Sequence, residues 1–260
     1  DVYKRQVLAL SKWSKGTQQR RHMRIALYSF LNYVVQRKDF PSKWLPPLVS
    51  DDEVVTKTKR IGYPLSDSQI IRLVDSIENP KWRFVIQLMA TYGLRPEDLK
   101  HLHTRNNGKD LWSDYRKSKG GKKGETTEPR QLFPIFVQDI DGSAINWNLK
   151  QRIHIKEELP PLNDSNSVGQ AVGRFLRDNK VWQQLKEEAL AERQQCVPYS
   201  FRHRYSYVGH NRQKDDGTYR APKQISDAMG HSLDVHLASY ARFMTKELAK
   251  NFDQEKVEIN

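Results

Sequence analysis

Three short strings of the sequence carry residue types that could act on a phosphate ester. Residues 91–99 read Thr-Tyr-Gly-Leu-Arg-Pro-Glu-Asp-Leu, residues 198–203 read Pro-Tyr-Ser-Phe-Arg-His, and residues 229–232 read Met-Gly-His-Ser. Tyr240 follows His231 by nine residues. Arginine offers paired, planar donors to phosphate oxygens, and a tyrosine hydroxyl can attack phosphorus once it loses its proton. Arg95, Arg202, His231 and Tyr240 are therefore the first candidates for a reactive site.

Together, the three strings resemble the motifs of the tyrosine recombinases of the phage-integrase type. In that family, a Gly-Leu-Arg turn is followed by an acidic residue three positions after the arginine, and Arg95 and Asp98 match this pattern. The second motif ends in Arg-His, and the third is Leu-Gly-His-Ser with a tyrosine nine residues beyond the histidine. No single motif is specific, but their order and spacing are. The resemblance covers roughly residues 60–250.

The resemblance implies a division of labour that agrees with the chemistry of metal-free phosphodiester cleavage. Such cleavage requires positive donors around the nonbridging oxygens, a nucleophile, and a proton source for the leaving 5′ oxygen. The two arginines would bind the nonbridging phosphate oxygens, and Tyr240 would form a 3′-phosphotyrosine that stores the energy of the broken bond. In the family, a lysine on a β-hairpin protonates the leaving oxygen. Lys117 fits that position best, with Lys119 close behind, and no cofactor is expected.

The second motif departs from the family at one position. Tyr199 stands three residues before Arg202, where histidine is commoner. A phenol can donate a hydrogen bond to a phosphate oxygen, but it is a poor general base at neutral pH. Either His231 and the hairpin lysine carry more of the proton transfer, or the activity is reduced. We keep Tyr199 among the candidate catalytic residues.

Each candidate also has a purely structural interpretation. Arg95 taken alone is typical of an arginine that caps a helix, and Asp98 is expected to orient an arginine rather than to act as an acid. His203 is expected to make a buried hydrogen bond that holds the second motif in place. Tyr240 could be a helix-face aromatic packed in the core. The hairpin lysines could belong to a solvated loop that touches the DNA backbone.

The charge balance favours a polyanionic partner. The 260 residues include 44 Lys and Arg against 31 Asp and Glu, which gives a formal net charge of +13. Double-stranded DNA fits this surplus, and an anionic membrane surface is the rival. No apolar run approaches the roughly 20 residues of a spanning helix. We therefore expect a cytoplasmic, bacterial or phage-encoded protein without a membrane partner, and a single cysteine agrees with a reducing compartment.

A metal-dependent alternative has little support in the spacing of possible ligands. Histidines stand at four scattered positions, and tandem aspartates stand at two: His101, His103, His210, His236, residues 51–52 and residues 215–216. The histidines have no cysteine or carboxylate partner at a recognised ligand spacing. The aspartate pairs lie in linker-like segments, where we expect them to be solvated. We therefore expect no metal.

The first 60 residues are expected to form a partial helical, DNA-binding region of the core-binding type. Apolar residues recur at helical spacing over residues 20–35, which predicts a basic amphipathic helix. Its expected DNA-binding residues are Lys12, Lys15, Arg20, Arg21 and Arg24, with a plain solvated helix as the alternative. A linker is expected over residues 51–60. Residues 1–6 resemble the translation of a sequencing-library adapter, so we expect them to be artefactual and the true chain to begin further upstream.

The remaining residues, 61–260, are expected to form the catalytic integrase-like domain. Helices are predicted near residues 66–77, 82–92, 96–102, 168–175, 181–190, 205–210, 224–229 and 237–250. Strands are predicted at residues 111–112 and 131–137, joined by a hairpin with a basic, flexible tip. The expected fold is thus mainly α with a small antiparallel β-sheet.

Three functions remain open at this stage. The first is a site-specific recombinase that cleaves and rejoins DNA in a synapse of four protomers, as in integration or excision of mobile elements. The second is a recombinase-derived DNA-binding protein that has lost activity, which the Tyr199 departure makes worth keeping. The third is a type IB topoisomerase, against which the Gly-His-Ser context argues. Covalent trapping on DNA would separate the first two.

Overall fold

The computed structural model divides the chain into two compact units, residues 1–60 (unit 1) and residues 61–260 (unit 2). It describes residues 2–45, 61–118, 124–162 and 167–244. None of the helices in these ranges is long and apolar enough to cross a membrane. The linker expected over residues 51–60 lies outside the described residues.

The described residues of unit 1 form two α-helices and a short 3-10 helix. These are α1 (Val2–Leu10), α2 (Gln18–Arg37) and η1 (Ser42–Trp44). The predicted helix over residues 20–35 is confirmed as α2, which begins where the Thr17 side chain accepts a hydrogen bond from the backbone N–H of Arg20. Its apolar face is only partly covered, because Leu31 and Val34 are buried whereas Met23, Ile25 and Phe30 are exposed.

The first six residues, expected to be artefactual, take part in unit 1. They contribute to α1 from Val2 onward. Gln6 is buried, and its side-chain amide donates to the carbonyl of Trp44 at 3.1 Å. In this structure, the segment therefore packs with the rest of unit 1.

Unit 2 begins with two helices whose ends match their sequence signals. Helix α3 (Asp67–Asp75) starts with a capping box between Ser66 and Gln69. Helix α4 (Pro80–Tyr92) starts at an Asn79 cap and ends at Gly93, which adopts the left-handed conformation with φ 57°. The helix predicted over residues 96–102 is a 3-10 helix, η3 (Pro96–His101), in which Arg95 and Asp98 occupy the N-cap and N3 positions.

A three-stranded antiparallel sheet follows, in the order β1-β2-β3. Its strands are β1 (Leu102–Arg105), β2 (Asp110–Ser113) and β3 (Arg130–Leu132), with Leu111 opposite both Thr104 and Leu132. Strand β1 was not predicted. The strand expected over residues 131–137 was too long: β3 ends before Pro134, which has no N–H to donate to a ladder. The expected fold class, mainly α with a small antiparallel sheet, is confirmed.

The regular elements that follow the sheet in the described residues of unit 2 are helices. Its helices are α5 (Leu149–His154), α6 (Val168–Arg177), α7 (Lys180–Ala191), α8 (Ser200–Asn211), α9 (Pro222–Met229), α10 (Leu233–Tyr240) and η4 (Ala241–Phe243). Two predictions of helix bounds were wrong. Helix α8 begins at Ser200 rather than near residue 205, so Arg202 and His203 are helical. Helix α10 begins at Leu233, where Ser232 caps it, and ends at Tyr240, whereas residues 245–250 of the predicted helix lie outside the described residues.

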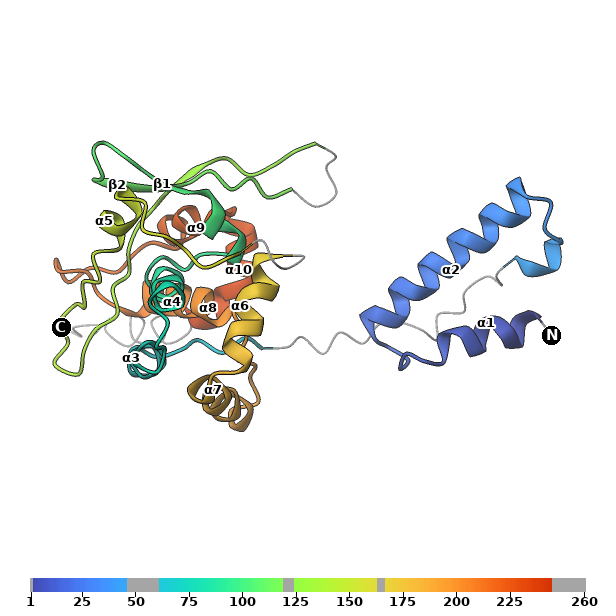
Figure 1. Cartoon of the computed structure of the whole chain (residues 1–260), viewed down its shortest axis with the longest axis horizontal. Helices are drawn as coiled ribbons and strands as arrows, with labels where there is room; N and C mark the ends of the chain where they lie inside the picture. Colours follow the sequence, from blue (N-terminus) through green and yellow to red (C-terminus); the bar gives the residue numbers. More distant parts are fainter. Residues whose placement is uncertain (1, 46–60, 119–123, 163–166, 245–260) are drawn as a thin grey trace, which may run out of the picture. The chain divides into compact units, whose positions relative to one another are not determined.

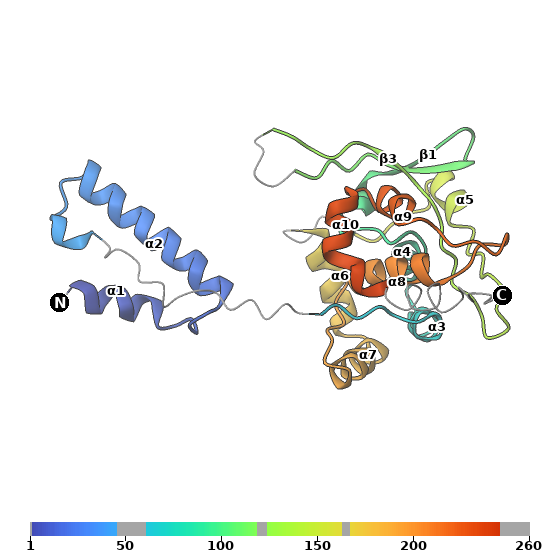
Figure 2. The same ribbon diagram turned by 180° about the vertical axis from the view of Figure 1, so that it is seen from behind.

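Two apolar clusters hold unit 2 together. The larger joins α3, α4, α6 and α7 with the sheet, and the smaller joins α8, α9 and α10 around Met229, Tyr205 and Tyr240. Helices α4 and α8 lie in the middle of the unit, with the sheet on one side and α3 and α7 on the other (Figures 1 and 2). The C-terminal ends of α4 and α9 thereby approach the first turns of α8.

Candidate active site

Two arginines from different motifs are held by the ends of two helices. Arg202 Nη1 donates to the carbonyl of Gly93, the C-cap of α4, at 2.8 Å, and its Nη2 donates to the carbonyl of Met229, the last residue of α9. Arg95 Nη2 donates to the carbonyl of Gly230 at 2.9 Å. The C-terminal end of a helix carries partial negative charge, so these carbonyls favour the two cations.

Glycine is required at both of these helix ends. Gly93 and Gly230 have φ angles of 57° and 68°, in the left-handed region that side chains disfavour. A Cβ on Gly93 would also lie 2.5 Å from the ring of Tyr205, and one on Gly230 would lie 2.7 Å from the side chain of Arg130. The glycines of the first and third motifs therefore allow their helices to end where the arginines need acceptors.

The two arginines are buried, yet their donors are not all used. Arg202 is fully buried and Arg95 is 8% exposed. Among the described residues, Arg202 Nε and Arg95 Nε and Nη1 find no hydrogen-bond partner. Burial and the neighbouring charge of Arg202 lower the pKa of Arg95. Unsatisfied buried donors on cations are costly, and these three nitrogens are available to an anion.

Asp98 orients an arginine, but one that the sequence analysis missed. Arg130, on β3, donates to both carboxylate oxygens of Asp98, at 3.0 and 2.8 Å. Asp98 also accepts from the backbone N–H of Arg95 and from the hydroxyl of Ser113, each at 2.8 Å. Burial opposes ionisation of Asp98, but the charge of Arg130 outweighs it, so the pKa of this carboxyl is lowered. The Asp98 carboxylate is thus bound to the Arg130 guanidinium and to the backbone N–H of Arg95.

Arg130 extends the cluster because it also reaches the end of α9. Its Nε donates to the carbonyl of Ala228 at 3.3 Å. Three consecutive carbonyls, those of residues 228–230, therefore accept from Arg130, Arg202 and Arg95 in turn. Nothing in the motif spacing pointed to Arg130. The predicted strand begins at residue 131, one position after Arg130, so it did not indicate this residue either.

Tyr240 lies at the end of α10 and is buried, being 2% exposed. Its ring is stacked on that of His231 at a centroid distance of 5.8 Å and an interplanar angle of 14°, and the ring of His203 lies 5.6 Å away. Burial raises the pKa of Tyr240 above its ordinary value, and the charge of Arg202 offsets this only in part. The tyrosine is therefore both packed in the smaller core cluster and adjacent to the arginine pair.

Tyr199 stands beside the same cluster but is more open to solvent, with 38% of its surface exposed. The guanidinium carbon of Arg202 lies 6.0 Å from its ring centroid. Burial opposes ionisation of Tyr199, but Arg202, Arg95 and a side-chain hydrogen bond with Tyr240 outweigh it, so the pKa of this phenol is lowered. The two tyrosines of the motifs therefore interact directly and have pKa values shifted in opposite directions.

His231 contacts both an arginine and a second histidine. Its Nδ1 lies 3.2 Å from Arg202 Nη2, and its Nε2 lies 2.9 Å from Nδ1 of His236. His236 in turn reaches His210, with 2.8 Å between their Nε2 atoms. The sequence analysis considered His210 and His236 only as possible metal ligands, because neither lies in a motif.

His203 does not make the hydrogen bond expected of it. In the described part of the chain, its Nδ1 is buried without a partner. The ring is held by packing instead: a Cβ on Gly62 would lie 2.0 Å from its Nε2, and the ring of Tyr199 packs edge-on at 5.5 Å. Burial lowers the pKa of His203 to about 4.

Lys117 is exposed on the arm between β2 and β3. The arm projects beyond the body of unit 2 (Figure 1). Lys117 pairs with Thr127 across it, with the backbone N–H of Thr127 donating to the Lys117 carbonyl at 2.8 Å. The positive charge of Lys117 contributes to the lowered pKa of Tyr199. Lys119 and the basic tip at residues 119–123 lie outside the described residues.

The expected DNA-binding residues of unit 1 do not share one environment. Lys12, Lys15 and Arg21 are exposed, and Arg24 is half-buried. Arg20 is buried, and its Nη1 donates to the carbonyls of Leu10 and Trp13 at 2.7 and 3.0 Å. The assignment of Arg20 to a DNA surface was therefore wrong in this structure, because its side chain caps the end of α1.

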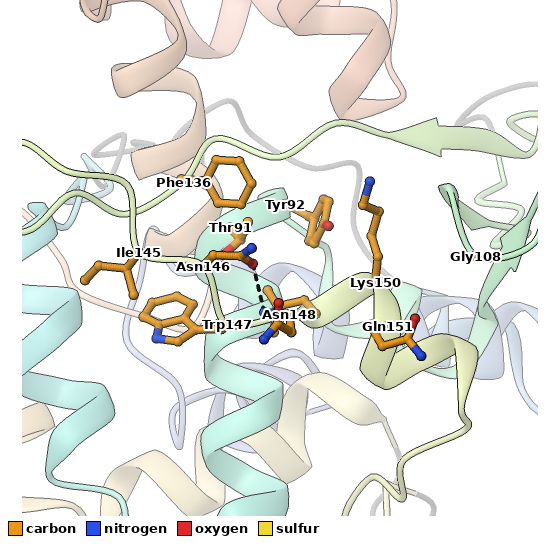
Figure 3. Close-up of a pocket in the computed structure, with 11 residues that line it drawn as sticks. Thr91, Tyr92, Gly108, Phe136, Ile145, Asn146, Trp147, Asn148, Lys150 and Gln151 are labelled. Carbon is orange, nitrogen blue, oxygen red and sulfur yellow. Dashed lines mark hydrogen bonds between the residues drawn. The ribbon is translucent and has the colours of Figure 1, made fainter.

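A separate cavity of about 310 Å³ lies between α4 and residues 136–151 (Figure 3). It is lined by Thr91, Trp147 and Lys150 among others, and a hydrogen bond from the backbone N–H of Asn148 to the side chain of Asn146 shapes one wall. None of the candidate catalytic side chains lines it. Within the described residues, no group of three or more His, Cys, Asp or Glu side chains is arranged to hold a metal ion.

The known proteins to which the chain is similar are distant in sequence. No protein-family model matches the chain. Excisase A from Nostoc sp. is 22% identical over 208 residues, which are 77% of this chain and 37% of that protein. The chain thus spans little more than a third of the length of the curated relative it matches.

Solved structures with similar folds include one of XerA recombinase, with 13% identity and a TM-score of 0.43 over 99% of this chain and 90% of the other. A second is the Tn1549 transposon integrase in complex with circular intermediate DNA, with 17% identity and a TM-score of 0.49 over 95% and 85% of the two chains. By its three motifs and its partial sequence match, the chain resembles the tyrosine recombinases of the phage-integrase type.

Proposed function

We propose that this chain is the catalytic part of a site-specific tyrosine recombinase, in which Tyr240 cleaves and rejoins DNA through a 3′-phosphotyrosine. The observation that carries the proposal is a pair of buried arginines with unused donors next to a buried tyrosine. The order of the motifs, the match to Excisase A and the net charge of +13 support it.

Arg95 and Arg202 are better placed to bind a phosphodiester than to pair with a carboxylate side chain of the protein. In the described residues, neither the Arg95 nor the Arg202 guanidinium forms a salt bridge, whereas Arg130 is fully engaged with Asp98. Their unpartnered nitrogens can donate to the nonbridging oxygens, where negative charge grows as phosphorus becomes five-coordinate. A bound phosphate would satisfy these donors.

The proposed reaction forms one bond to phosphorus and breaks another. The hydroxyl oxygen of Tyr240 attacks phosphorus and passes its proton to solvent through its hydrogen bond with the exposed Tyr199, while the bond from phosphorus to the 5′ oxygen breaks and that oxygen gains a proton. We assign the hydrogen bond that orients the Tyr240 hydroxyl to Tyr199, and the proton for the leaving oxygen to Lys117. Rejoining reverses the same steps and needs no ATP.

Other parts of the proposal concern the partners. Lys12, Lys15 and Arg21 of unit 1 are exposed and basic, and we assign them to phosphates of the DNA backbone. Strand exchange would require a synapse of four protomers on double-stranded DNA, serving integration or excision of a mobile element. DNA affinity should then fall steeply with salt, because each neutralised phosphate releases counterions.

The test is a covalent trap without metal. Wild-type protein and Tyr240→Phe are incubated with nicked suicide duplexes that carry candidate attachment sites from the DNA flanking the gene. We expect a denaturant-resistant protein–DNA adduct with wild type only, because the substitution removes the phenolic oxygen alone. Gel-shift binding should be nearly equal for the two proteins.

Each other outcome has a definite meaning. An adduct with Tyr240→Phe would refute the nucleophile assignment. Binding without any adduct, on all sites tried, would favour an inactive recombinase-derived DNA-binding protein. Relaxation of supercoiled plasmid without sequence preference would favour a type IB topoisomerase.

A further inference from the structure

Three histidines form a continuous hydrogen-bonded chain that ends on Arg202. It runs from His210 on α8 to His236 on α10 and then to His231, which follows α9. The ring nitrogens are 2.8 Å apart at the first link and 2.9 Å at the second, and His231 Nδ1 lies 3.2 Å from Arg202 Nη2. Only the His231 end belongs to a recognised motif.

Arg202 determines the direction of every hydrogen bond in this chain. A guanidinium can only donate, so Nδ1 of His231 must accept and be unprotonated. A neutral His231 then carries its proton on Nε2 and donates it to Nδ1 of His236. By the same rule, His236 is protonated on Nε2 and donates to Nε2 of His210. One tautomer of each ring is therefore selected by a donor at the far end.

The surroundings keep the three rings neutral. His236 and His210 are 0% and 3% exposed. Burial lowers the pKa of both to about 4, and burial together with the charges of Arg202, Arg95 and Arg130 lowers that of His231 to about 3. In the described part of the chain, none of the hydrogen bonds made by these rings involves a carboxylate.

We propose that His236, itself held by His210, is a positioning residue that fixes the tautomer of His231 and thereby the orientation of the Arg202 guanidinium. This inference rests on the proposed function, because it concerns the group that would bind the phosphate. A carboxylate at this place could hold Arg202 as firmly, but it would neutralise the positive charge that the phosphate needs. A neutral imidazole supplies the acceptor without the charge.

The first measurement is the tautomer of each ring in the wild-type chain. Protonated and unprotonated ring nitrogens of histidine have widely separated ¹⁵N chemical shifts, and the His231 signals are assigned by their loss in His231→Gln. We expect His231 and His236 to be protonated on Nε2 and His210 on Nδ1. A His231 ring protonated on Nδ1, or doubly protonated at pH 7, would overturn the proposal without any functional assay.

Variants of His236 then test whether the link matters. The side-chain oxygen of Asn can lie near the Nδ1 position and accept from His231, so His236→Asn should keep most of the cleavage rate. His236→Leu has a similar volume but no acceptor, so we expect cleavage to fall by about 10- to 100-fold, as for other lost supporting hydrogen bonds. It should also populate both His231 tautomers. His154→Leu, at an exposed histidine on α5, is the control.

The outcomes separate this proposal from the proposed function. If wild type forms no adduct but the tautomers are as expected, the proposed function fails and the positioning role of His236 is retained as a structural one. If the adduct forms and His236→Leu leaves both its rate and the His231 tautomer unchanged, the positioning role is refuted. Equal loss of rate in His236→Asn and His236→Leu, with both folded, would refute it as well.

Discussion

Arg202 and Arg204 stand two residues apart on α8, and both are fully buried, yet their surroundings are opposite. Arg204 donates from Nε and Nη2 to Asp67, and from Nη1 to the carbonyls of Ala90 and Ile135. Arg202 is held by two carbonyls and a histidine, without a carboxylate, and its Nε has no partner in the described residues. The two faces of one helix thus carry a saturated cation and an unsaturated one.

If Arg202 binds phosphate as proposed, the use of its donors distinguishes it from the structural Arg204 without knowledge of a ligand. A buried arginine whose donors are all hydrogen-bonded has none free for a ligand, and its role is structural. A buried charge with unused donors costs stability, and the structure retains it only if another group completes it. Burial alone did not distinguish the two.

The largest effect should come from Arg202→Lys. Lysine keeps the charge but loses the planar, paired donors, so we expect adduct formation to slow by about 100- to 1,000-fold. The thermal midpoint should stay near that of wild type or rise, because an incompletely satisfied guanidinium is removed. A quenched time course of adduct formation measures the rate, and thermal unfolding of the same sample measures the midpoint. A large drop in the midpoint would erase the proposed contrast with Arg204.

The converse substitution is Arg204→Met, which should act on the fold first. Among the described residues, it leaves Asp67 with Arg212 alone as an ion-pair partner, at 2.5 Å. We expect the free energy of unfolding to fall by about 3 kcal/mol, the lower end for a broken buried pair. Urea unfolding measures the change. The double variant Asp67→Asn with Arg204→Met should recover part of the loss, and a single variant as stable as wild type would contradict the assignment.

Acid should separate the two regions by pH. The lowered pKa values of His210 and His236, about 4 each, mean that the unfolded chain binds protons first as pH falls below about 6.5. The free energy of unfolding contributed by these two histidines is then lost between about pH 6.5 and 4, by up to about 1.4 kcal/mol per pH unit for each histidine. The charges of Arg204 and Arg212 overcome burial and lower the pKa of Asp67. The stability that ionised Asp67 contributes is therefore fully present at pH values above the ordinary pKa of an aspartate, and it is lost only as the pH falls below that value.

Urea unfolding at a series of pH values measures this separation. In His210→Gln, the loss between pH 6.5 and 4 should be smaller than in wild type, while the loss at lower pH should be unchanged. A wild-type stability that stays flat down to pH 4 would show that the histidines are not neutral in the folded state.

Sequence patterns identified the residues that local strings bring together, and missed those that only the tertiary fold selects. Arg95, Arg202, His231 and Tyr240 were named from motif spacing, and the structure places them in one cluster. Arg130 could not be found in this way, because its partner Asp98 lies 32 residues away. His236 follows the motif residue His231 by five positions but belongs to no motif itself, and its second partner, His210, lies 26 residues away. Helical periodicity also could not show that Arg20 is buried, because it does not say what packs on a helix.

The end of α9 makes the three arginines of the cluster mechanically dependent on one another. Because the carbonyls of residues 228–230 each hold one of them, no arginine can shift with α9 without the other two shifting in register. The three arginines are therefore expected to move together rather than independently. A displacement of one guanidinium by a ligand would be opposed by the hydrogen bonds that all three arginines make to the end of α9. A displacement of α9 would weaken all three of these hydrogen bonds together.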